Sequence, residues 1–159
     1  NYVSIIIDVK TARSLKKGFT LIELLVVIGI LAVLLAITLI AINPARQFSQ
    51  ANNTKRSSDV NAILNALGQY AADNKGALPT GVTTTTQTIS NTAANICASL
   101  VPQYIAALPV DPLTNNGTAV TDCAAAYTTN YTVIKRATDN RITVTAPAAE
   151  LSATISATR

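Results

Sequence analysis

The chain of 159 residues contains no histidine and no methionine. Histidine is the commonest general base and metal ligand in proteins, so its absence removes the usual basis of acid–base and metal-dependent catalysis. The sequence also shows no nucleophile–base pairing and no glycine-rich phosphate-binding loop. We therefore expect a protein that is not an enzyme and that needs no cofactor.

Charged residues are few, and the positive excess is confined to the amino-terminal end. Residues 1–18 carry four basic side chains and one acidic one, a net charge of +3, whereas residues 19–159 carry eight and seven, a net charge of +1. Basic residues in front of an apolar segment remain in the cytoplasm during membrane insertion. Nucleic-acid binding instead requires a basic face. The charge pattern indicates a topology signal, and we do not expect nucleic acid as a partner.

Residues 19–42 form a continuous apolar segment in which Glu23 is the only charge. A helix of about 24 residues is roughly 36 Å long, enough for a bilayer core of about 30 Å. A single strand in lipid would leave its backbone groups unpaired, so the segment is expected to be helical. Pro44 follows the segment, and its missing N–H and its ring predict a kink near residues 40–43.

Residues 43–75 continue the helix with one apolar face. The face has the i, i+3, i+4, i+7 spacing of an amphipathic helix, at Val60, Ile63, Leu64, Leu67 and Ala71. Lys75-Gly76 ends the pattern. The sequence thus predicts a long helix over about residues 20–75, whose apolar first half must lie in lipid or against other copies of the chain.

Residues 76–159 are expected to form a globular head. Residues 76–126 are rich in turn-forming residues, with one short helix predicted between Asn91 and Leu100. Alternating apolar residues around Asp139-Asn140 predict a β-hairpin, and Leu151, Ala153 and Ile155 predict a third strand that begins at Leu151. The expected fold class is α+β, with a long amino-terminal helix packed on a small antiparallel sheet at about residues 127–158.

The most informative string is Lys16-Lys17-Gly18-Phe19-Thr20-Leu21-Ile22-Glu23-Leu24-Leu25. An ordinary secretory signal has small residues for cleavage after its apolar core, and none follow here. A carboxylate inside a membrane helix is costly and usually functional. Residues 16–42 closely resemble the prepilin signature of type IV pilins and of the pseudopilins of type II secretion.

The resemblance implies processing at a defined bond. A prepilin peptidase would cleave between Gly18 and Phe19 and methylate the new amine of Phe19, which makes Glu23 the fifth residue of the mature chain. Glu23 would pair with the amine of its own or of the next subunit, because a paired charge in a low dielectric costs less than an unpaired one. Family leaders begin with Met, whereas this chain begins with Asn1. We therefore expect residues 1–14 to be an extension or a fragment, with Leu15 as an alternative start.

The resemblance also implies a function without catalysis. The chain would be a structural subunit of a bacterial type IV pilus and would polymerise through its apolar helix with identical subunits. An inner-membrane assembly platform and its ATPase would drive this step. The precursor would lie in inner-membrane lipid with its leader in the cytoplasm and its head outside, and would then move into an extracellular filament. The alternatives are a pseudopilin of type II secretion and a minor or tip pilin that binds DNA or surfaces.

The head contains two further features, a pair of cysteines and a loop rich in turn-forming residues. Cys97 and Cys123 both follow the apolar segment, so an exported head predicts a disulfide between them. Residues 107–112 resemble the loop of major pseudopilins that precedes a calcium site, with Asp111 and Asp122 as oxygen ligands. The same residue types form ordinary turns, and we take the turn as the interpretation and calcium as the alternative.

Overall fold

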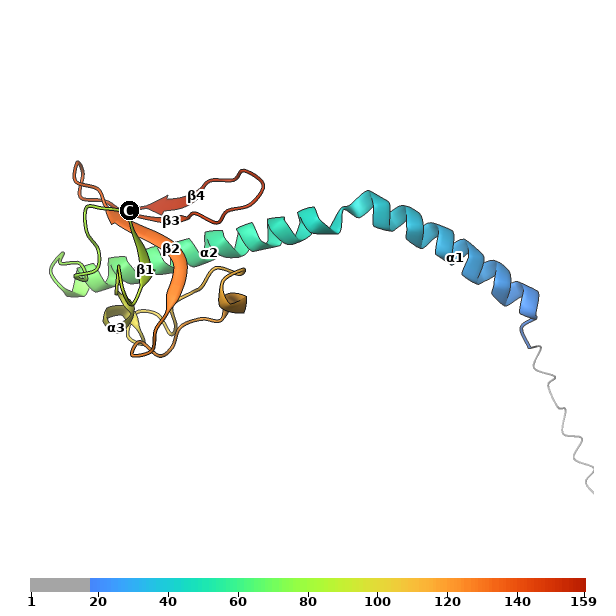
Figure 1. Cartoon of the computed structure of the whole chain (residues 1–159), viewed down its shortest axis with the longest axis horizontal. Helices are drawn as coiled ribbons and strands as arrows, with labels where there is room; N and C mark the ends of the chain where they lie inside the picture. The colour runs from blue at the N-terminus through green and yellow to red at the C-terminus, as the bar shows by residue number, and fades with distance from the viewer. Residues whose placement is uncertain (1–17) are drawn as a thin grey trace, which may run out of the picture. The chain divides into compact units, whose positions relative to one another are not determined.

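The computed structural model describes residues 18–159, so the leader residues 1–17, including the proposed start at Leu15, lie outside the described residues. The chain divides into two compact units at the boundary between Ile42 and Asn43. The first contains helix α1 (Leu21–Ile42), and the second contains helix α2 (Pro44–Asp73) with a four-stranded sheet (Figure 1).

Helix α1 is apolar on all sides except at Glu23 and Thr38, and none of its 22 residues is buried. Its length of about 33 Å matches the hydrocarbon core of a bilayer. Within residues 18–159, α1 is the only helix whose length and composition fit a membrane span. The membrane-anchoring segment expected from the sequence is therefore present as a helix.

The predicted long helix is divided in two at Asn43. This residue lies in the left-handed region, with φ 36° and ψ 80°, and its side chain accepts a hydrogen bond from the Arg46 backbone N–H. Pro44 occupies the first turn of α2, where its missing N–H costs no hydrogen bond. Asn43 therefore follows the last residue of α1 and caps the first turn of α2. The chain forms two helices here rather than one bent helix.

The carboxyl end of α2 is closed by Asn74 and Gly76. Asn74 donates its backbone N–H to the Tyr70 carbonyl, and Gly76 donates to the Ala71 carbonyl at 2.7 Å. Gly76 has a φ of 87°, a conformation that glycine adopts without steric cost. The helix ends two residues before the predicted stop at Lys75.

The sheet has four antiparallel strands in the order β1-β2-β3-β4. They are β1 (Gln87–Ser90), β2 (Thr128–Lys135), β3 (Ile142–Ala146) and β4 (Ile155–Thr158). Strands β2 and β3 are the predicted hairpin, with Val133 opposite Val144 in the register. Strand β1 was not predicted, because its four residues include a single large apolar side chain.

Two sequence predictions in the head were wrong in their bounds. The third strand begins at Ile155, because residues 150–153 form a turn in which Leu151 has a φ of 57° and is 51% exposed. The short helix α3 covers only Cys97–Leu100. The residues before α3 are not helical, since Ala94 donates its backbone N–H to the carbonyl of Thr88 in β1. A short 3-10 turn, η1 (Asn115–Gly117), follows later in the chain.

The core of the head lies between α2 and the sheet. The predicted apolar face of α2 is buried at Val60, Ile63, Leu64 and Leu67. These side chains belong to one cluster with Tyr131 and Val133 of β2 and with Ile142 and Val144 of β3. The α+β arrangement expected from the sequence, a helix packed on an antiparallel sheet, is confirmed.

The predicted disulfide between Cys97 and Cys123 is present and joins α3 to the segment before β2, across a sequence separation of 26 residues. Cys97 is buried in the core cluster, whereas most of residues 111–126 lack regular structure. The bond therefore fixes a part of the head that has few large apolar side chains.

Replacement of both cysteines by alanine is expected to lower the free energy of unfolding of the head by about 3–4 kcal/mol, because the unfolded chain regains the entropy of an open loop. Urea unfolding of the full chain in detergent, followed by circular dichroism, measures the change. Reduction of the wild-type chain with a thiol reagent should give a similar loss. An unchanged unfolding midpoint in both experiments would contradict a stabilising role of the disulfide.

Candidate functional site

Helix α1 begins with a reciprocal cap formed by Thr20 and Glu23. One carboxylate oxygen of Glu23 accepts hydrogen bonds from the Thr20 backbone N–H and from the Thr20 hydroxyl, both at 2.8 Å. The Glu23 backbone N–H donates to the Thr20 hydroxyl oxygen at 3.2 Å. This is a capping box, in which two otherwise unpaired donors of the first turn are satisfied. The spacing Thr-x-x-Glu is visible in the sequence, but our sequence analysis assigned Glu23 only to assembly.

The predicted cleavage bond lies directly in front of this cap. Gly18 and Phe19 precede the helix without regular secondary structure, and Phe19 is 81% exposed. A Cβ atom added to Gly18 would meet nothing within 4 Å among the described residues. The bond is therefore accessible in this part of the structure, and the second carboxylate oxygen of Glu23 has no hydrogen-bond partner among residues 18–159.

The head contains a buried polar cluster centred on Arg56. The guanidinium donates to the Asp111 carboxylate through Nε at 2.6 Å and through Nη2 at 3.2 Å. Nη1 donates to Glu150 at 2.8 Å and to the Asn53 side-chain oxygen at 3.0 Å. Arg56 and Asp111 are fully buried, and Glu150 is 28% exposed at its side chain. The bidentate contact is a strong, directional form of ion pair.

The cluster connects three segments that are distant in the sequence. Arg56 belongs to α2, Asp111 to the loop after Leu108, and Glu150 to the loop between β3 and β4. Glu150 also accepts hydrogen bonds from Ser49 and Asn52 of α2. Within the described residues, no buried side-chain nitrogen or oxygen lacks a partner. Polar contacts therefore attach both loops to one face of α2. This face carries Ser49, Asn52, Asn53 and Arg56.

Sequence analysis did not find this cluster. Arg56 is not among the apolar residues from which the buried face of α2 was predicted, and arginine is seldom fully buried unless it is paired. Its partners lie 55 and 94 residues away in the sequence, so no local pattern could identify them. The only available signal was its position seven residues before Ile63, on the side of the helix that carries Val60.

The predicted calcium ligands have different surroundings. The Asp111 carboxylate binds the Arg56 guanidinium and also accepts a hydrogen bond from the Leu113 backbone N–H at 2.9 Å. Asp122 is exposed and accepts one from the Ala124 backbone N–H. Among the described residues, no group of three or more acidic, histidine or cysteine side chains could hold a metal ion. A cation at Asp111 would have to compete with the paired guanidinium for the same carboxylate.

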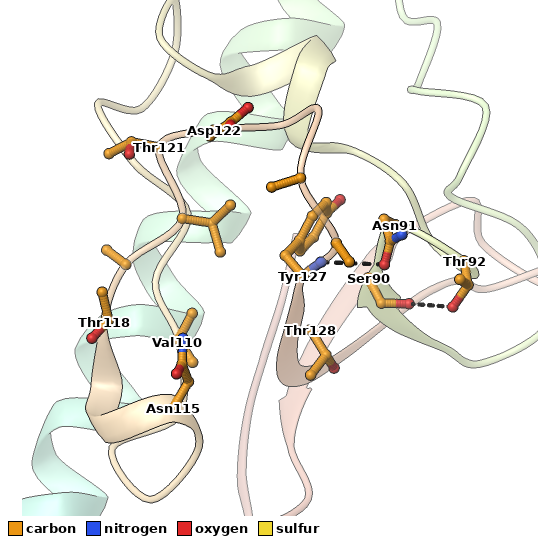
Figure 2. A pocket seen from close by; sticks show the side chains of 14 residues that line it. Ser90, Asn91, Thr92, Val110, Asn115, Thr118, Thr121, Asp122, Tyr127 and Thr128 are labelled. Atoms are coloured by element: carbon orange, nitrogen blue, oxygen red, sulfur yellow. Dashed lines mark hydrogen bonds between the residues drawn. The ribbon is translucent and has the colours of Figure 1, made fainter.

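A groove of about 730 Å³ opens on the head beside these loops. One wall contains Asn115, Thr118 and Thr121, the other contains Ser90, Asn91 and Thr92, and Tyr127 and Thr128 lie between them (Figure 2). The Tyr127 backbone N–H donates to the Asn91 side-chain oxygen at 3.3 Å. Asp122 is the only charged residue of the lining.

Replacement of Arg56 by methionine is expected to lower the free energy of unfolding by about 3–5 kcal/mol, because Asp111 would remain buried without a counter-charge. Lys55→Met provides the matched control. Lys55 is the neighbouring cation, and its pair with Asp59 at 2.9 Å is partly exposed, so its loss should cost less than about 1 kcal/mol. Urea unfolding of the full chain measures both changes. Equal losses in the two variants would refute the special role of the buried pair.

The pKa of the Glu150 carboxyl is lowered, mainly by the hydrogen bond from Arg56 and further by those from Asn52 and Ser49. A carboxyl whose pKa is lower in the folded state stabilises the fold above its unfolded pKa, and this stabilisation is lost as the pH falls through the folded value. The melting temperature of the head is therefore expected to fall as the pH drops below about 4.3. Glu150→Gln should melt lower than wild type at pH 7 and show a smaller decrease in acid. An unchanged pH dependence in this variant would contradict the assignment.

Comparison with known proteins bears on the amino-terminal segment. Residues 13–39 match the model of the prokaryotic N-terminal methylation motif, the leader signature of type IV pilins and pseudopilins. No curated protein and no solved structure matched the chain. The match includes the predicted cleavage bond, Phe19, the capping residues Thr20 and Glu23, and most of α1. The chain thus carries the amino-terminal signature of the type IV pilin and pseudopilin class, in front of a helix-and-sheet head with a pilin-like arrangement.

Proposed function

We propose that the chain is a structural subunit of a bacterial type IV pilus, cleaved by a prepilin peptidase between Gly18 and Phe19 and polymerised through α1. The observation that carries the proposal is the unburied apolar surface of α1, most of which lies within the methylation motif. Apolar surface exposed to water is unfavourable by about 25 cal/mol per Å². The surface therefore requires lipid in the precursor and identical helices in the filament.

Identical helices with uniform apolar surfaces provide little to fix their axial positions. Glu23 is the one carboxylate of α1, and the second oxygen of that carboxylate has no partner among the described residues. Cleavage would create a positive amine on Phe19, next to the cap. A charge pair between this amine and Glu23 of the same or a neighbouring subunit would be strongly favoured over unpaired charges in a low dielectric. Such a pair would define the register of each subunit.

Assembly would place the heads of identical subunits on the outside of an open helical array. The energy would come from the ATPase of an inner-membrane platform, since the chain contains no phosphate-binding glycine-rich loop. A pseudopilin of type II secretion is the second candidate. The resemblance of residues 107–112 to the pseudopilin loop favours it, and a secretion defect without surface filaments would distinguish it from a pilus subunit.

Replacement of Glu23 by alanine or valine is expected to reduce filament yield at least tenfold, while the precursor still inserts in the membrane. Glu23→Gln separates the two roles of this residue. Glutamine retains an acceptor oxygen for Thr20 but has no charge, so it should fail to assemble if the charge pair is required. Electron microscopy and quantification of filaments sheared from the source cells provide the measurement.

Mass spectrometry of the sheared subunit provides an independent test of processing. A subunit that begins at N-methylated Phe19 supports the proposal. Normal filament yield from Glu23→Ala and Glu23→Val would disprove the register role, and an uncleaved, membrane-bound chain without filaments would disprove the assignment as a pilus subunit.

A further inference from the structure

The groove of the head has a lining that selects for a particular ligand charge. None of its 14 lining residues is basic, and Asp122 is the only acidic one. A phosphate or another polyanion would find no counter-charge there, and a divalent cation would find only one carboxylate. The lining therefore favours an uncharged ligand.

Several polar side chains of the groove have no hydrogen-bond partner within the described residues. These are the hydroxyls of Thr118, Thr121 and Thr128, the side-chain amide of Asn115 and the Nδ2 of Asn91. Hydroxyls both donate and accept, and the amides provide donors and acceptors. The lining also contains the small apolar side chains of Ala119, Val120, Ala125 and Ala126. Such a surface suits a molecule that has many hydroxyls and apolar faces between them.

Part of the main chain of the walls is already paired. Both backbone groups of Val120 bond to Leu108 at 2.9 Å, and the Asn91 backbone N–H donates to the Tyr127 carbonyl at 3.2 Å. Ser90 faces Thr128 in the register of β1 and β2. A peptide that adds as a strand needs a row of unpaired backbone groups, and the paired strands β1 and β2 offer none at Ser90 and Thr128. Recognition at this wall therefore depends on side chains.

The groove is also held in shape by covalent and polar contacts. Cys123 follows Asp122 in one wall and is bonded to Cys97 of α3. The Tyr127 hydroxyl donates to the Asn95 side-chain oxygen at 2.9 Å and accepts from the Cys97 backbone N–H at 3.4 Å. A preformed site reduces the entropy cost of binding. The volume of about 730 Å³ is within the range of small-molecule sites.

We propose that this groove binds a neutral oligosaccharide, with Asn91 and Asn115 and the hydroxyls of Thr118, Thr121 and Thr128 as its hydrogen-bonding groups. The proposal does not require polymerisation, so it can be tested on the unassembled chain.

The experiment uses the full chain in an amine-oxide detergent, whose head group contains no sugar that could compete. The probes are maltotriose, cellotriose, chitotriose and mannotriose, with a heparin hexasaccharide and a single-stranded oligonucleotide as charged comparisons. Binding is measured by titration with two-dimensional NMR of the 15N-labelled chain. At least one neutral trisaccharide is expected to saturate, with the largest shifts at the backbone amides of residues 90–92 and 115–122.

The double variant Thr118→Val/Thr121→Val should weaken this binding by about tenfold, because two hydroxyl partners are lost while the side-chain shape is kept. Thr84→Val is the matched control, since Thr84 is an exposed threonine outside the groove, and its affinity should equal that of wild type. Absence of binding to all four neutral probes overturns the proposal. So does an unchanged affinity of the double variant, or tighter binding of either charged probe in the groove.

Discussion

The constraint on which the rest of the molecule depends is the unburied apolar surface of α1. Its 22 residues include one carboxylate, and none of them is covered within the described residues. Such a helix is stable in a bilayer or among other apolar helices, because its backbone groups are paired internally. The basic leader, the capped helix start and the separate polar head are each consistent with a segment that must be inserted in a membrane.

The stability of the head depends on apolar packing and on the pairing of one buried cation. Arg56 would be costly to bury alone, and its two carboxylate partners make its burial tolerable. These contacts fix loops that contain little regular structure. The disulfide fixes the later part of the loop region, just before β2, in the same way.

Much of this fold could be predicted from periodicity. The apolar run of α1, the i, i+3, i+4 face of α2 and the alternation in β2 and β3 are local signals, and the structure contains these elements. Strand β1 and the start of β4 were not predicted correctly, because pairing with a neighbouring strand determines them more than their own sequence does. Arg56 and the groove depend on contacts between distant segments, which a single sequence does not reveal. The methylation motif was recognised from the sequence because its signal is local.

The capping box at Thr20 has a consequence for the proposed cleavage. All three of its hydrogen bonds lie on the carboxyl side of the Gly18–Phe19 bond. Removal of the leader would therefore break none of them, and the first turn of α1 would keep its conformation. Proteolysis would then be conformationally silent: it would change the charge at the end of the chain without a refolding step, so that the cleaved subunit is ready for the next event as soon as the protease releases it.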